Sequence, residues 1–232
     1  MIEYLFVGDS WAEKAWTESN YQTSTQPTDV RLADWWPGQY TKITVPGQGN
    51  LALLDRIQQL QVPDHVPIVW IFTEPGRDYG RVTGQDQFDW IRSSEFFNTR
   101  KQLEPAILST IRLELPNPIA LIGGLADVNT LMAESLGFHV LCSSWQQWIA
   151  NTLNSQWFKK GWGASDIGWR MHYDNVIPSH EATFAWDEQI KEWCWWEDEG
   201  YFCHEHPTPR ANQEFAQCLK PGVEQWLKNQ TS

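Results

Sequence analysis

Five short apolar runs, each ended by glycine, proline or a polar turn, constrain the fold of this chain more than any other feature of its sequence. The runs cover residues 2–7, 40–45, 67–73, 118–123 and 138–142. They are rich in β-branched and aromatic residues, which favour strands. Helix-like segments separate most of them, and strands that alternate with helices are joined by right-handed crossovers. We therefore expect one α/β domain with a parallel sheet that is covered on both faces.

Amphipathic spacing predicts helices at residues 51–60 and 94–115. We also expect helices at 127–136, from 145 to 153, at 179–196 and at 209–227. In the segment 51–60, leucine and isoleucine recur at helical intervals, and Asn50 is available as the N-cap. Residues 79–89 are polar and predict a loop, and residues 197–209 show no regular pattern.

Length and charge limit the classes of partner. The 232 residues suffice for a single domain, which we assign to residues 1–232. A formal net charge of −12 argues against a nucleic-acid or anionic membrane partner. The apolar runs are too short to cross a bilayer, and Glu3 and Gly8 interrupt any secretory leader at the N-terminus. Four cysteines without a CxxC pair fit a reducing compartment, so we expect a cytoplasmic protein.

Four polar blocks follow the expected strands or precede the last helix. They are 8–10 (Gly-Asp-Ser), 47–50 (Gly-Gln-Gly-Asn), 73–78 (Thr-Glu-Pro-Gly-Arg-Asp) and 204–208 (His-Glu-His-Pro-Thr). Parallel strands bring their carboxyl ends to one edge of the sheet, where open α/β sheets keep their ligand sites. A serine nucleophile needs a base and donors for the developing oxyanion. The first block offers a hydroxyl, the second a backbone N–H group and the last an imidazole.

In these blocks the sequence resembles the SGNH (GDSL-type) hydrolase family. Block 8–10 matches the family's first block, block 47–50 looks like its glycine turn, and His206 with the proline after it resembles its final block. The resemblance spans the chain and implies a flavodoxin-like, three-layer α/β/α sandwich with a mainly parallel five-stranded sheet. It also implies Ser10 as nucleophile, His206 as general base, and the N–H groups of Ser10 and Gly47 as oxyanion donors. We expect neither a cofactor nor a metal ion.

The third block departs from the family pattern. The family has an asparagine there that contributes to the oxyanion hole, whereas block 73–78 contains none. Thr73, Glu74 or Arg77 is left to occupy that place. A carboxylate near the oxyanion would repel it unless Arg77 or a proton neutralised the charge. Asp9 and Asn50 complete the group of candidate supporting residues around this edge.

The final block also departs, because Cys203 stands where the family has an aspartate three residues before the histidine. Either the base works without an acid, or Glu205, Asp198 or Glu199 replaces it. His204 is a reserve candidate for the base, since it lies only two residues from His206.

Two other kinds of site are less favoured. Residues 47–52 fit part of a dinucleotide-binding fingerprint, but they follow the second strand, and no acidic residue ends the next one. Cys203 and His206, with other histidines of the chain at positions 172, 180 and 204, contain metal-ligating atoms. Their spacing matches no zinc pattern.

The function that these observations favour is a serine ester hydrolase that removes a small acyl group. The alternative is a binding module on the same fold that has lost the chemistry. The sixteen tryptophans have two interpretations, core packing and aromatic platforms for a saccharide. Packing is the favoured one. The second suggests O-acetyl groups of a saccharide among the small-molecule substrates, and the oligomeric state is left open.

Overall fold

The computed structural model describes residues 3–9, 12, 31–45, 48–73, 75–83, 96–124, 128–145, 148, 202–203, 206–207 and 209–230. Among these residues, no helix is both long enough and apolar enough to span a membrane.

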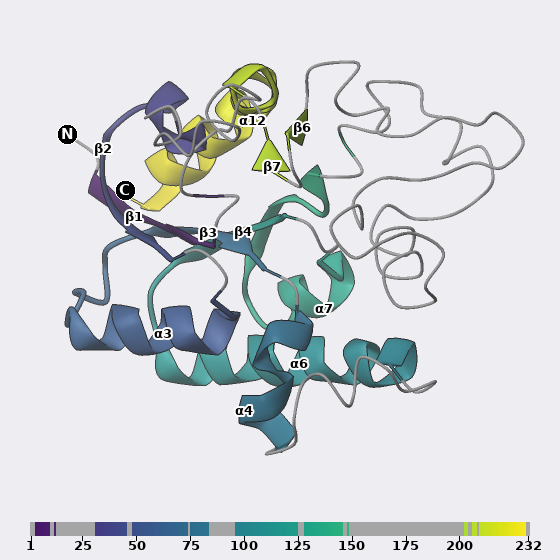
Figure 1. Ribbon diagram of the computed structural model, residues 1–232. Coiled ribbons are helices and arrows are strands. Elements are labelled where there is room, and N and C mark those ends of the chain that lie inside the picture. The colour runs from purple at the N-terminus through teal and green to yellow at the C-terminus, as the bar shows by residue number, and fades with distance from the viewer. Residues whose placement is uncertain are drawn as a thin grey trace, which may run out of the picture.

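Five parallel strands form the central sheet (Figure 1). They are β1 (Glu3–Gly8), β2 (Gln39–Thr44), β3 (Ile68–Phe72), β4 (Ile119–Gly123) and β5 (His139–Cys142). Their order is β2-β1-β3-β4-β5, and every neighbouring pair is parallel. This is the flavodoxin-like order, in which the chain reverses its direction of winding between β1 and β3. The predicted α/β class and parallel sheet are confirmed, and each strand lies within one residue of its expected bounds.

The helices also follow the sequence pattern. The main ones are α3 (Asn50–Gln59), α6 (Phe96–Glu114), α7 (Thr130–Ser135) and α12 (Pro209–Gln230). The helix expected at residues 179–196 lies outside the part of the chain that the structure describes. Three shorter helical segments are η1 (Leu32–Trp35), η2 (Pro75–Asp78) and α4 (Tyr79–Thr83). The loop expected from residue 79 is therefore wrong over α4, because a helix of five residues is too short to show periodicity. Within the region expected to be irregular, β6 (Phe202–Cys203) and β7 (His206–Pro207) form an antiparallel pair.

Helices cover both faces of the sheet, as Figure 1 shows. Along β3, Val69 and Ile71 point into a core shared with α12 and η1, whereas Trp70 and its neighbours on that face pack against α3 and α6. All five residues of β3 are fully buried. A strand that is buried on both faces has a continuous apolar sequence, and this explains why β3 could be predicted from the sequence.

The described tryptophans pack in these cores. Trp70 and Trp145 are fully buried, and Trp36 and Trp226 are nearly so. For these residues the packing interpretation is confirmed.

Helix α12 runs antiparallel to the sheet. Near its start, Phe215 stacks on Trp145, three residues beyond the carboxyl end of β5, with ring centroids 4.6 Å apart. Near its end, Trp226 stacks on His139, the first residue of β5, at 6.2 Å. The first turn of α12 therefore lies toward the carboxyl edge of the sheet, and β7 lies beside that end of the helix in Figure 1.

Candidate functional site at the carboxyl edge of the sheet

Asp9 joins the carboxyl ends of β1 and β3. It directly follows β1, and only 1% of its surface is exposed. The Thr73 hydroxyl donates a hydrogen bond of 2.7 Å to its Oδ2, and Arg77 Nη1 lies 3.1 Å from the same oxygen. Buried charges require such partners, because burial without them costs several kcal/mol. The structure thus brings Asp9 together with Thr73 and Arg77, predicted site residues at least 64 positions further along the chain.

Arg77 belongs to η2, the turn immediately beyond β3, and its side chain is 25% exposed. Its contact with Asp9 has the distance of an ion pair without the alignment of a hydrogen bond. Nη1 itself is buried and has no hydrogen-bond acceptor among the residues that the structure describes. The pair neutralises the charge of Asp9 while leaving a guanidinium donor unused.

Asn50 ties the start of α3 to the end of β3. Its side-chain amide donates to the Thr73 carbonyl oxygen and its side-chain oxygen accepts from the Thr73 N–H, both at 3.0 Å. The Asn50 side chain thereby binds both backbone groups of Thr73, the residue after β3, as a neighbouring strand would. The expected N-cap role is therefore wrong: Asn50 is the first helical residue, and Gly49 is the N-cap.

Asp78 provides the cap that Gly49 lacks. Its carboxylate accepts hydrogen bonds from the N–H groups of Asn50 (2.7 Å) and Leu51 (3.0 Å). A Cβ atom at position 49 would collide with Oδ1 of Asp78, so glycine is required there by close approach. Sequence reasoning assigned no role to Asp78. The available signal was a helix start without a capping side chain, whose first amides need an acceptor from elsewhere.

Burial raises the pKa of Asp78 to about 6, although the amide bonds from Leu51 and Asn50 and the charge of Arg81 act in the opposite direction. In the unfolded chain this carboxyl has its ordinary pKa of 3.8. The folded state therefore binds the proton more tightly. The stabilisation from protonated Asp78 is complete below pH 4 and is lost as the pH rises through 6.

The Asp78→Asn variant is expected to lack this pH dependence. The free energy of unfolding of the wild type, minus that of the variant, should fall by about 2–3 kcal/mol between pH 4 and pH 7. Urea unfolding of both proteins at several pH values measures this difference in the free energy of unfolding. Glu224→Gln is the matched control, because Glu224 is in a surface ion pair with Lys220 and its difference should stay within about 0.5 kcal/mol. A difference for Asp78→Asn that is flat or rises with pH would contradict the pKa assignment.

The other predicted site residues fall outside this description. Ser10 follows Asp9 in the chain, but it lies outside the described residues, as do Gly47, Glu74, His204 and Glu205. His206 belongs to β7, and its side chain is outside the description. Of the three candidates for the third-block position, Thr73 and Arg77 both contact Asp9.

The described part of the chain contains no cluster of three or more histidine, cysteine, aspartate or glutamate side chains that could hold a metal ion. Most of the cysteine–histidine set considered from the sequence lies outside that part. In comparisons with known proteins, no family model matches the chain, and no curated protein matches it either.

Proposed function

We propose that this protein is a serine ester hydrolase that removes a small acyl group, with Ser10 as nucleophile and His206 as general base. The observation that supports it most is the network at the carboxyl edge of the sheet. Thr73 and Arg77 both contact Asp9 there, and Asn50 binds Thr73. Ser10 follows Asp9 directly, and consecutive Cα atoms are about 3.8 Å apart. The proposed nucleophile is therefore the chain neighbour of a residue in this network.

The direction of α12 supports His206 as the partner of Ser10. The helix begins at Pro209 and runs antiparallel to the strands, so its start lies toward the carboxyl edge. His206 precedes that start by three residues. We therefore expect the parallel topology and the returning last helix to bring the early serine and the late histidine to one end of the molecule.

In the proposed reaction, Ser10 Oγ attacks the ester carbonyl carbon while His206 accepts the hydroxyl proton. The π electrons of the carbonyl move to its oxygen, and the N–H groups of Ser10 and Gly47 donate hydrogen bonds to the oxyanion. The intermediate collapses, the alkoxide leaves with the proton from His206, and an acyl-enzyme remains. Water, activated by His206, releases the acid and regenerates Ser10.

A fluorophosphonate probe tests the proposal, because it reacts with serine hydroxyl groups that a neighbouring base activates. We expect the probe to label the wild type, with the adduct on Ser10 in peptide mass spectrometry, and to fail on Ser10→Ala. Hydrolysis of p-nitrophenyl acetate should accompany labelling. Acetylated monosaccharides as a second substrate set then test the saccharide version. A wild type that is neither labelled nor active would instead favour the binding module.

A further inference from the structure

We propose that Arg77 is a catalytic residue of this site, whose guanidinium donates a hydrogen bond to the oxyanion at the position where the third block lacks an asparagine. The inference rests on the proposed hydrolase function and adds a specific group to it. Three features of Arg77 carry it: an unused donor, its position relative to residue 10, and its charge.

The first feature is the unused donor. Nη1 of Arg77 is buried, and no acceptor among the described residues receives a hydrogen bond from it. Buried donors in native proteins are almost always paired, and each exception calls for an explanation. A guanidinium has five N–H groups and no acceptor, so this N–H can be satisfied only by an acceptor atom beyond those of the described residues. An oxyanion that forms during the reaction is such an atom.

The second feature is position. Arg77 Nη1 lies 3.1 Å from Oδ2 of Asp9, the residue before the proposed nucleophile. Asp9 and residue 10 are consecutive, so the guanidinium contacts the side chain of the residue next to the proposed nucleophile. Asp9 is itself held by the Thr73 hydroxyl, so the pair is fixed to the ends of two adjacent strands. Arg77 is thus oriented before any substrate arrives.

The third feature is charge. Asp9 is buried next to the site, and negative charge that develops on the substrate oxygen would be repelled by its carboxylate. Arg77 offsets that charge and keeps further N–H groups available, which a neutral asparagine could not do. During attack by Ser10, the guanidinium only donates a hydrogen bond. It transfers no proton, and the serine proton still goes to His206.

The experiment compares steady-state kinetics of Arg77→Ala with the wild type on p-nitrophenyl acetate. We expect kcat to fall by about 10²–10³-fold, the usual effect of losing one oxyanion donor, with KM changed by less than about threefold. About 50 mM guanidinium chloride, far below denaturing concentrations, should restore part of kcat in Arg77→Ala and none in Ser10→Ala. Arg81→Ala is the matched control, because it removes the same type of side chain from an exposed ion pair with Asp55, and its other effect is on the charge of Asp78.

A second variant separates donation from simple charge balance. If Arg77 only neutralises Asp9, the double variant Asp9→Asn/Arg77→Ala should regain the wild-type kcat. If Arg77 donates to the oxyanion, the double variant should stay as slow as Arg77→Ala. Should Arg77→Ala fail to fold, Arg77→Lys keeps the charge but not the planar fork, and we expect at least a tenfold loss of kcat.

The outcomes distinguish the two proposals. Wild-type activity and labelling at Ser10, together with full activity of Arg77→Ala or recovery in the double variant, would overturn the role of Arg77 alone. Absence of labelling and hydrolysis in the wild type would overturn both proposals.

Discussion

Replacing Ser10 with alanine is expected to lower kcat for a short p-nitrophenyl ester by about 10⁴–10⁶-fold. Without the hydroxyl, no acyl-enzyme can form, and only donors and binding contacts remain to assist attack by water. We expect the loss of kcat to come from the missing hydroxyl and not from damage to the site. Residue 10 follows Asp9, which is tied to Thr73 and Arg77, so alanine removes the reacting oxygen and leaves that network in place.

Ser135→Ala is the matched control for this experiment. Ser135 ends α7 and donates to the Met132 carbonyl oxygen, and the same chemical change there should leave kcat unaltered. Thermal unfolding of both variants should stay within a few degrees of the wild type. A Ser10→Ala variant that retains more than about a tenth of the wild-type kcat would show that the hydroxyl is not the nucleophile.

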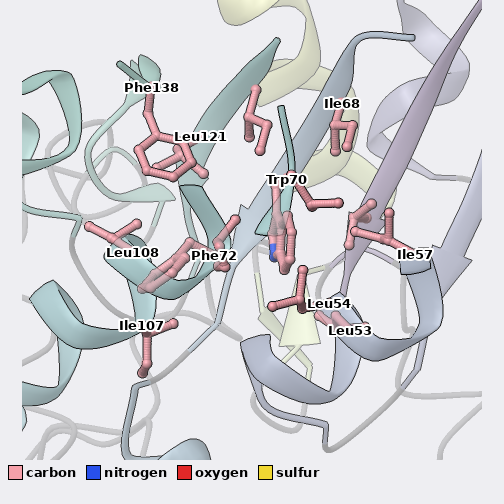
Figure 2. Close-up of a cluster of buried hydrophobic side chains, with 14 of the residues drawn as sticks. Leu53, Leu54, Ile57, Ile68, Trp70, Phe72, Ile107, Leu108, Leu121 and Phe138 are labelled. Carbon is pink, nitrogen blue, oxygen red and sulfur yellow. The ribbon is translucent and has the colours of Figure 1, made fainter. Parts of the chain in front are cut away.

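The Trp70→Ala variant should lose about 3–5 kcal/mol of the free energy of unfolding. Trp70 lies on the central strand β3 and is fully buried. Figure 2 shows its ring among Leu53, Leu54 and Ile57 of α3, on the face of the sheet that α3 and α6 cover. Truncation to alanine leaves a cavity where strand and helix meet, and the surrounding side chains can collapse into it only in part.

Trp70→Phe separates the loss of volume from the loss of the indole N–H group. No acceptor among the described residues pairs with that N–H, so its removal breaks no hydrogen bond. We expect a loss of only about 1–2 kcal/mol, because an aromatic ring still fills most of the space. Leu131→Ala, at a site 82% exposed, should change stability by less than about 0.5 kcal/mol. Urea unfolding followed by circular dichroism measures all three, and equal losses for Trp70→Ala and Trp70→Phe would contradict this account.

The strands were predictable because each signal is local. Val69, Trp70 and Ile71 belong to an apolar run ended by a polar turn, and the same pattern recurs four more times. Hydrophobic spacing likewise predicted α3 and α6. Five parallel strands with intervening helices allow few topologies, so the expectation that blocks 8–10 and 73–78 share one edge followed from the sequence.

The partners at that edge were not predictable in the same way. Asn50 has the residue type and position of an N-cap, yet it binds the backbone of Thr73, while Asp78, 28 residues away, caps the helix. The preference of asparagine for the N-cap position did not decide the outcome here. Gly49, which has no side chain, allows the Asp78 carboxylate to approach the first helical amides and cap the helix instead. Likewise, the sequence listed Thr73 and Arg77 as alternatives for one position, and the structure shows both in contact with Asp9.

The sequence by itself therefore determined the α/β class, the parallel strands and the polar blocks that follow them, because these depend on the periodicity and turn chemistry of neighbouring residues. Only the tertiary structure decided which side chains pair at the sheet edge, and that a buried donor of Arg77 beside Asp9 has no hydrogen-bond acceptor among the described residues. Such pairings require groups far apart in the chain to be placed with a precision of about a few tenths of an ångström, and no local sequence pattern encodes that placement.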